Sequence, residues 1–188
     1  MRLFLAFTFS ENVRQKIFHN ILLLQQEINY GVKWVERENL HVTFRFLGNL
    51  DKDILEKMCL SLSEIVGKFS LFSLSFGDVK VIPNPRHPRL VWYDMHGEVD
   101  TALNLFSDCE KELIGIGLGK ADHPLSLHTT LGRVRKPIDA DWEKALKQLN
   151  PIYDKVLCKD LTLYKSELTR RGPIYSIVKK FPLKGSNQ

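Results

Sequence analysis

Cysteine is scarce and scattered in this chain of 188 residues. Its three cysteines, Cys59, Cys109 and Cys158, are odd in number, lie far apart and form no Cys-x-x-Cys pair. Disulfide frameworks and structural zinc sites need paired or closely spaced cysteines, so this usage argues against both. The histidines also lack a His-Glu-x-x-His or similar spacing, so we predict no metal site. Free cysteines fit a reducing compartment, and we expect a cytoplasmic location.

Long hydrophobic runs are missing too. The apolar stretch from Leu3 to Phe9 is short for a signal peptide, and no small-residue cleavage site follows it before Glu11. A buried first strand explains it better. No run approaches the roughly 20 apolar residues of a membrane-spanning helix, so we expect no membrane contact. With 44% hydrophobic and 26% charged residues, the composition is that of an ordinary globular protein.

Acidic residues are outnumbered by basic ones, 22 to 27, which gives a formal net charge of +5. A basic chain favours an anionic partner such as RNA or a nucleotide. A lysine-rich surface with no such partner would give the same charge, so the charge leaves both interpretations open.

One short pattern, Leu-His-x-Thr followed by an apolar residue, occurs twice, at 40–44 and at 127–131. Both copies lie in runs of β-branched and aromatic residues, which predicts a strand for each. Side chains two residues apart in a strand point to the same side, so each copy presents an imidazole and a hydroxyl on one face. A lone His-x-Thr is usually only part of a strand, whereas a duplicated one indicates a shared site.

The two pairs are His41 with Thr43 and His128 with Thr130. An imidazole gives or takes a proton near neutral pH, and a hydroxyl can hydrogen-bond to an oxyanion. Two pairs that face each other would supply one base, one acid and two neutral donors, which suits phosphoryl transfer. The other histidines have no comparable context; they are His19, His87, His96 and His123.

The rest of the chain predicts alternating helices and strands. Apolar spacing and end signals predict helices at 11–29, 51–67, 98–114 and 139–149, and strands at 2–9, 32–35, 40–47, 71–82, 89–95, 125–134, 155–167 and 174–181. Gly77-Asp78 is expected to interrupt its strand as a bulge or turn. This order predicts an α+β fold, with helices on the outer faces of antiparallel sheets. Since the two histidines are nearly half a chain apart and no linker separates them, we expect one domain, 1–188, made of two pseudo-symmetric lobes around a central cleft.

At these motifs the chain resembles the two-histidine (2H) phosphoesterase superfamily. Within it, the chain is most similar to the RNA 2′,3′-cyclic phosphodiesterase family, also called the 2′-5′ RNA ligase family. Besides the motifs, the similar segments are Leu3-Phe4-Leu5-Ala6-Phe7, Trp34-Val35, Phe46-Leu47-Gly48, Pro88-Arg89, Val91-Trp92, Gly132-Arg133-Val134, Ser166-Glu167-Leu168, Gly172-Pro173-Ile174-Tyr175 and Phe181-Pro182-Leu183. The chain departs from the family at Leu127, where Pro is common, and at Thr129, where an aliphatic residue is usual.

The resemblance implies a bilobal fold, no metal or organic cofactor, and hydrolysis of RNA 2′,3′-cyclic phosphate ends to 2′-phosphomonoesters. It also implies that some members join RNA ends through a 2′-5′ bond. By the same resemblance, His41 protonates the leaving 3′-oxygen, His128 activates the water, and Thr43 and Thr130 hydrogen-bond the phosphoryl oxygens. Two nearly symmetric pairs do not by themselves reveal which histidine is the acid.

Three further residues are candidates for substrate contact. Arg45 is in phase with His41 in an unbroken strand, so alternation puts it on the same face. Arg133 matches a family arginine near the phosphate, but alternation puts it on the far face unless Gly132 marks a bulge. Tyr175 would stack on a base or ribose, although a buried strand tyrosine fits the pattern equally well.

The expected partners are RNA with 2′,3′-cyclic phosphate ends, such as tRNA fragments, or cyclic nucleotides, and the expected oligomeric state is a monomer. Two alternatives stay open. The chain could be a non-catalytic RNA-end or nucleotide-binding module, or a phosphodiesterase of another 2′-5′ or cyclic nucleotide. The loops at 83–88 and 168–173 would set the choice of substrate.

Overall fold

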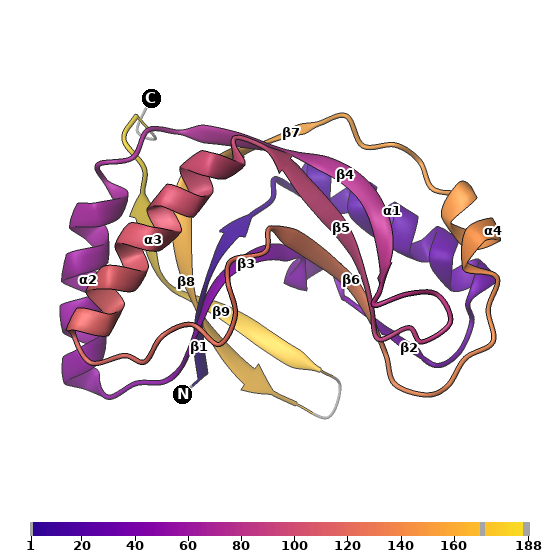
Figure 1. The fold of residues 1–188 in the computed structure, drawn as a ribbon, viewed down its shortest axis with the longest axis horizontal. Helices are drawn as coiled ribbons and strands as arrows, with labels where there is room; N and C mark the ends of the chain where they lie inside the picture. Colours follow the sequence, from indigo (N-terminus) through magenta and orange to yellow (C-terminus); the bar gives the residue numbers. More distant parts are fainter. Residues whose placement is uncertain (1, 170–171, 186–188) are drawn as a thin grey trace.

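Two antiparallel sheets dominate the computed structural model, which describes residues 2–169 and 172–185 (Figure 1). The strands are β1 (Arg2–Thr8), β2 (Val32–Trp34), β3 (His41–Asn49), β4 (Phe72–Ile82), β5 (Leu90–Gly97), β6 (His128–Val134), β7 (Lys155–Cys158), β8 (Asp160–Leu168) and β9 (Pro173–Pro182). The first sheet has the order β3-β1-β8-β9, and the second has the order β2-β6-β5-β4-β7. The predicted α+β fold is confirmed.

Two pairs of helices cover the sheets. The α-helices are α1 (Glu11–Glu27), α2 (Lys52–Val66), α3 (Val99–Gly115) and α4 (Trp142–Lys147), and η1 (Arg37–Asn39) is a 3-10 turn. Helices α2 and α3 pack on the first sheet, where the Phe106 ring of α3 meets the Phe44 ring edge-on at 5.3 Å. Helix α1 covers the second sheet, and its Asn20 donates a hydrogen bond to the Tyr93 hydroxyl (Figure 1). Helix α4 contacts α1.

The prediction of a single strand at 155–167 is wrong in one respect, because these residues form two strands that lie in different sheets. Residues before Lys159 pair with β4 in the second sheet, and residues after it pair with β1 in the first. The buried positions continue through this crossover, so the apolar pattern does not show where the pairing partner changes. Helix α4 is also shorter than predicted. Asp141 caps it by accepting a hydrogen bond from the Lys144 amide at 2.9 Å.

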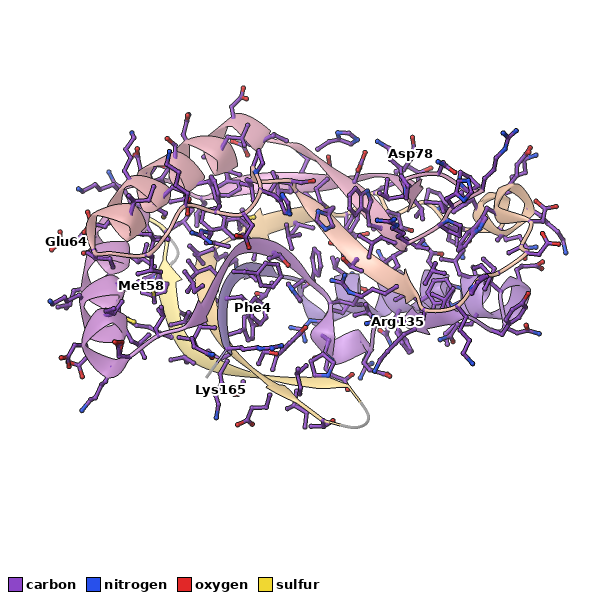
Figure 2. The ribbon with its side chains drawn as sticks, turned by 60° about the horizontal axis from the view of Figure 1, so that its bottom comes forward. Phe4, Met58, Glu64, Asp78, Arg135 and Lys165 are labelled. Carbon is purple, nitrogen blue, oxygen red and sulfur yellow. The ribbon has the colours of Figure 1, made fainter. Side chains whose placement is uncertain are left out.

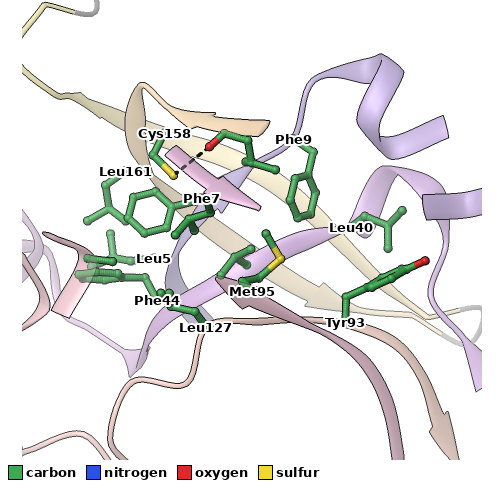
Figure 3. Packing of buried hydrophobic residues seen from close by; sticks show 14 of the residues in the cluster. Leu5, Phe7, Phe9, Leu40, Phe44, Tyr93, Met95, Leu127, Cys158 and Leu161 are labelled. Carbon is green, nitrogen blue, oxygen red and sulfur yellow. Dashed lines mark hydrogen bonds between the residues drawn. The ribbon is translucent and has the colours of Figure 1, made fainter. Parts of the chain in front are cut away.

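A single cluster of buried apolar residues joins the two sheets. Figure 3 shows Leu5, Phe7 and Phe44 of the first sheet packed in the same cluster as Tyr93 and Met95 of the second. Because the cluster is continuous, the strands that carry the two histidine motifs rest on one common core. Strands β3 and β6 contact each other near the centre of the molecule (Figure 1).

Both motif strands contain a bulge at the same place. In β3, Leu5 lies opposite Arg45 and Ala6 opposite Thr43, which leaves Phe44 as the extra residue. In β6, Gly132 and Thr130 lie opposite neighbouring residues of β5, which leaves Leu131 as the extra one. The first six residues of the two strands also share one burial pattern. The motif strands are therefore structural equivalents, as the pseudo-symmetric prediction requires. The predicted irregularity at Gly77-Asp78 is confirmed as well.

None of the helices in the described part of the chain has the length and apolar character needed to cross a membrane.

Candidate active site

A cleft of about 960 Å³ lies between the two sheets and contains residues of both motifs. His41 and Thr43 of β3 line it together with Thr130 of β6. The His128 ring lies beside it, close enough for its charge to act on His41. The remaining lining comes mainly from β2, from the segment around η1 and from the β8–β9 hairpin. The structure thus brings the four residues of the two His-x-Thr pairs to one place.

The hydrogen bonds of His41 fix its tautomer and its direction. Its Nδ1 lies 2.7 Å from the Asn39 carbonyl oxygen, and a carbonyl only accepts, so Nδ1 carries the hydrogen. Its Nε2 is therefore unprotonated in the neutral ring and accepts a hydrogen bond from the Thr43 hydroxyl at 3.0 Å. The rings of Phe4 and Tyr175 lie 5.1 and 5.5 Å from the imidazole and hold it from two sides.

His128, on β6 of the second sheet, is held in the same way. Its Nδ1 donates to the Ser126 carbonyl oxygen at 2.8 Å, which leaves Nε2 for the substrate. The Trp92 ring lies over the imidazole, with centroids 4.1 Å apart and planes at 34°. Trp92 in turn donates from Nε1 to Asp94 at 3.1 Å. An indole face attracts a cation, so Trp92 favours the imidazolium form that His128 adopts after it takes a proton.

Trp92 has no role in the sequence-based prediction. Its only signal in the sequence is the family-like pair Val91-Trp92, which gives no indication of a contact with His128. The contact depends on the register of β5 against β6, where Trp92 lies opposite Thr130. A long-range strand register of this kind cannot be read from local periodicity.

Both histidines are weaker bases than free imidazole. Burial lowers the pKa of His41 to about 4, the Asn39 carbonyl opposes this, and the charges of His128 and Arg133 lower it further. Burial also lowers the pKa of His128; the Ser126 carbonyl opposes the shift, Arg133 adds to it, and Asp94 opposes it. Both rings are therefore neutral at pH 7 in the free protein. An anion bound between them would raise both pKa values, so that the two imidazoles would take up protons more readily.

Arg133→Met is expected to raise the pKa of both His41 and His128, because the guanidinium charge lowers both. Titration of the two imidazoles by NMR measures the change directly. Lys136→Met is the matched control, since it removes the same charge from a residue that does not line the cleft and leaves both titrations in place. Unchanged pKa values in Arg133→Met would contradict the placement of Arg133 beside the two rings.

Arg133 lies in the cleft, as the expected bulge requires. The extra residue Leu131 shifts the alternation of β6 so that Arg133 points to the same side as Thr130. Gly132 makes room for this, because a Cβ there would lie 2.7 Å from Val32 and 2.8 Å from Trp34. Glycine therefore lets β2 approach β6 closely at the bulge.

The expectation for Arg45 is wrong, since it does not line the cleft. The bulge at Phe44 turns Arg45 inward, where it is 9% exposed and forms an ion pair with Glu110 of α3. Arg45 also donates to the Gly119 carbonyl oxygen at 2.6 Å. The same bulge turns Phe46 into the cleft at the position equivalent to Arg133. Sequence reasoning missed Phe46, because no glycine announces the bulge in β3.

Tyr175 lies in the cleft wall, half-buried and in contact with His41, which fits a role at the site. Burial raises the pKa of its hydroxyl, so the phenol stays protonated near neutral pH and can donate a hydrogen bond. Within residues 2–169 and 172–185, no group of three or more His, Cys, Asp or Glu side chains is arranged to hold a metal ion.

Gly132→Ala is expected to lower the free energy of unfolding by about 1–3 kcal/mol, because the added methyl group overpacks against Val32 and Trp34. The Trp34 ring lines the cleft, so its displacement should also raise KM for a nucleotide substrate. Denaturant unfolding and steady-state kinetics measure the two effects. Gly115→Ala is the control, since nothing lies near its added Cβ. A Gly132→Ala protein as stable as the parent would contradict the close approach of β2.

The sequence is similar to known proteins over almost its whole length. The family model described as "LigT like Phosphoesterase" matches residues 13–93. The RNA 2′,3′-cyclic phosphodiesterase of Archaeoglobus fulgidus is 32% identical over 181 residues, which cover 96% of this chain and 99% of that one. The RNA 2′,3′-cyclic phosphodiesterase of Methanocaldococcus jannaschii is 31% identical, over 96% of this chain and 100% of that one.

Solved structures share the fold. The Thermus thermophilus protein TT0787 superposes with a TM-score of 0.79 at 25% identity, over 98% of this chain and 99% of its own. E. coli LigT complexed with 3′-AMP superposes with a TM-score of 0.78 at 22% identity, over 97% of each chain.

Proposed function

Because the chain belongs to the RNA 2′,3′-cyclic phosphodiesterase family, within the 2H phosphoesterase superfamily, we propose that it opens 2′,3′-cyclic phosphate ends of RNA and leaves a 2′-phosphomonoester. One observation carries the proposal. Two imidazoles whose Nδ1 atoms are tied to carbonyl oxygens leave both Nε2 atoms available beside one cleft, with Arg133 next to them. General acid–base catalysis requires such a pair.

The proposed reaction adds one water across one phosphorus–oxygen bond. His128 Nε2 takes a proton from the water as its oxygen bonds to phosphorus. The bond from phosphorus to O3′ breaks, and the protonated Nε2 of His41 gives its proton to O3′. Negative charge on the non-bridging oxygens increases along the way, where the Thr43 and Thr130 hydroxyls and the Arg133 guanidinium can stabilise it. The two rings then exchange protons with solvent to return to the starting state.

Binding of the substrate favours the protonated form of His41, which is the form that acts as the acid. His41 has a pKa of about 4 in the free protein and must carry a proton on Nε2 to act as the acid. The phosphodiester is an anion, so its binding raises this pKa and takes up a proton. Thr43 donates to Nε2 while the ring is neutral and can turn its hydroxyl to the phosphate once Nε2 is protonated. Catalysis then needs one protonated and one neutral imidazole, and this requirement gives a bell-shaped pH dependence.

The proposed substrates are RNA with 2′,3′-cyclic phosphate ends, tRNA fragments among them, and small 2′,3′-cyclic nucleotides. The proposed setting is the cytoplasm, with the protein as a monomer. The same ring opening with the 5′-hydroxyl of a second RNA in place of water would join the ends through a 2′-5′ bond, again with O3′ as the leaving group that takes the proton.

The test is turnover of an RNA oligonucleotide with a 2′,3′-cyclic phosphate end and of adenosine 2′,3′-cyclic phosphate, both in excess chelator. We expect hydrolysis of both, independent of added divalent metal. Tight binding without hydrolysis would instead assign a non-catalytic module. Hydrolysis confined to 2′-5′-linked oligonucleotides would assign a different phosphodiesterase.

A further inference from the structure

Three neighbouring cations lie on the wall of the cleft that the second sheet provides. Lys33 of β2 lies opposite Arg133 of β6, and Arg135 follows two residues later. All three line the cleft. Throughout the described residues, no carboxylate forms an ion pair with Arg133 or Arg135. Glu36 and Glu38 also line the cleft, and neither pairs with these arginines.

Two arginines that line a cleft without a carboxylate partner indicate an anionic ligand, because neighbouring like charges repel each other. The cyclic phosphate that reacts between the histidines accounts for Arg133. It does not account for Arg135. This residue follows Arg133 by two positions, which is roughly 6.7 Å in an extended chain. That distance is comparable with the spacing of successive phosphates in a nucleic-acid strand.

The backbone holds Arg135 in place. Its amide donates to the Gly31 carbonyl oxygen at 2.7 Å, and Gly31 has φ of 77°, a left-handed conformation that suits glycine. This bond ties the chain just after β6 to the residue just before β2. Figure 2 shows Arg135 near the end of β6, away from Phe4, which packs on His41. Arg135 therefore has a fixed backbone position, beyond the reacting centre.

We infer that Arg135, together with Lys33, forms a second anion subsite that binds the phosphate on the 5′ side of the terminal nucleotide. This inference rests on the proposed function and adds to it a preference for RNA ends over mononucleoside cyclic phosphates. The cleft has room for it, because about 960 Å³ is at the upper end of the size of sites that enclose a small molecule. The Trp34 side chain also lines the cleft and follows Lys33 in β2, where it offers a surface on which a base can stack.

The test compares three substrates that differ only on the 5′ side: adenosine 2′,3′-cyclic phosphate, its 5′-phosphorylated form, and the dinucleotide adenylyl-(3′,5′)-adenosine 2′,3′-cyclic phosphate. Both substrates with the extra phosphate should have the higher kcat/KM. Arg135→Gln should lower kcat/KM for these two by about tenfold and leave the plain nucleoside cyclic phosphate within about twofold. Lys136→Gln is the matched control, because it removes the same charge from the adjacent residue outside the cleft and should change none of the three.

Salt dependence gives a second readout. The kcat/KM for the 5′-phosphorylated substrate should fall more steeply with salt concentration than that for the plain nucleoside cyclic phosphate, because salt screens the extra ion pair, and Arg135→Gln should abolish the difference. Equal losses on all three substrates would assign Arg135 to the reacting phosphate and overturn the inference. A preference for the dinucleotide that Arg135→Gln leaves intact would also overturn it, in favour of base stacking alone.

Failure of the proposed function can be told apart from failure of the subsite. If the wild-type protein hydrolyses none of the three substrates, the proposed function fails. The subsite is then measured by binding, as the affinity for adenosine 2′,5′-bisphosphate relative to adenosine 2′-monophosphate. A preference for the bisphosphate that Arg135→Gln removes supports the subsite, and equal affinities in the wild-type protein overturn it.

Discussion

His41→Ala and His128→Ala are each expected to lower kcat for adenosine 2′,3′-cyclic phosphate by about 10²–10⁴-fold. Each change removes one of the two Nε2 atoms that exchange protons with the substrate and the water. The double variant should lose little more than the worse single variant, because the two rings act as a unit in one step. Steady-state kinetics measures all three. His19→Ala is the control, since His19 is exposed on α1 and does not line the cleft. Full activity in either single variant would contradict the proposed mechanism.

A substrate with a better leaving group distinguishes the histidine that acts as the acid from the one that acts as the base. An aryl phosphodiester with a 4-nitrophenolate leaving group departs without being protonated, so it needs a general base but little help from an acid. His41→Ala should therefore lose much less activity on this substrate than on the cyclic nucleotide, whereas His128→Ala should lose activity on both. The opposite pattern would exchange the two roles. This result matters because the hydrogen bonds of the two rings are nearly equivalent.

Arg45→Met is expected to lower the free energy of unfolding by about 3–5 kcal/mol. The change leaves Glu110 without its cation, at 14% exposure, in the interior between β3 and α3. It also leaves the Gly119 carbonyl oxygen without its donor. Denaturant unfolding of the folded protein measures the loss. At temperatures where the variant stays folded, KM should change little, because Arg45 does not line the cleft.

A double variant separates this structural role from a substrate contact. Arg45→Met with Glu110→Leu replaces the pair by apolar side chains and should recover much of the lost stability. Recovery is incomplete, because the Glu110 carboxylate also accepts a hydrogen bond from the Ala121 amide at 2.9 Å. Through these bonds the pair holds the loop that leads toward the second motif. A variant of Arg45 with unchanged stability and a raised KM would restore the expectation that Arg45 contacts the substrate.

The sequence predicts most of the fold because its signals are local. Ser10 caps α1 by accepting from the Val13 amide, and the pattern of apolar residues in α1 gives its buried face. The two His-x-Thr pairs are predictable because two-residue alternation holds from His41 to Thr43 and from His128 to Thr130.

Beyond the threonines, the alternation of side chains fails in both strands. The sequence indicates this failure only where a glycine stands at the bulge. Gly132 marks the bulge in β6 and so predicts the side of Arg133. In β3 the equivalent position is Arg45, which carries no such signal, so the bulge there is invisible and alternation assigns Arg45 to the wrong face. The contact of Trp92 with His128 and the change of sheet at Lys159 depend on which strands pair, and long-range pairing leaves no local trace.

The regiochemistry of hydrolysis is the sharpest test of the roles of the two histidines. Adenosine 2′,3′-cyclic phosphate is incubated with the protein in excess chelator, and phosphorus NMR identifies the product. With His41 giving its proton to O3′, the predicted product is adenosine 2′-monophosphate alone, and its formation should be lost in His41→Ala and in His128→Ala. Adenosine 3′-monophosphate as the product, or a 2′-monophosphate that still forms at the wild-type rate without either histidine, would contradict the account.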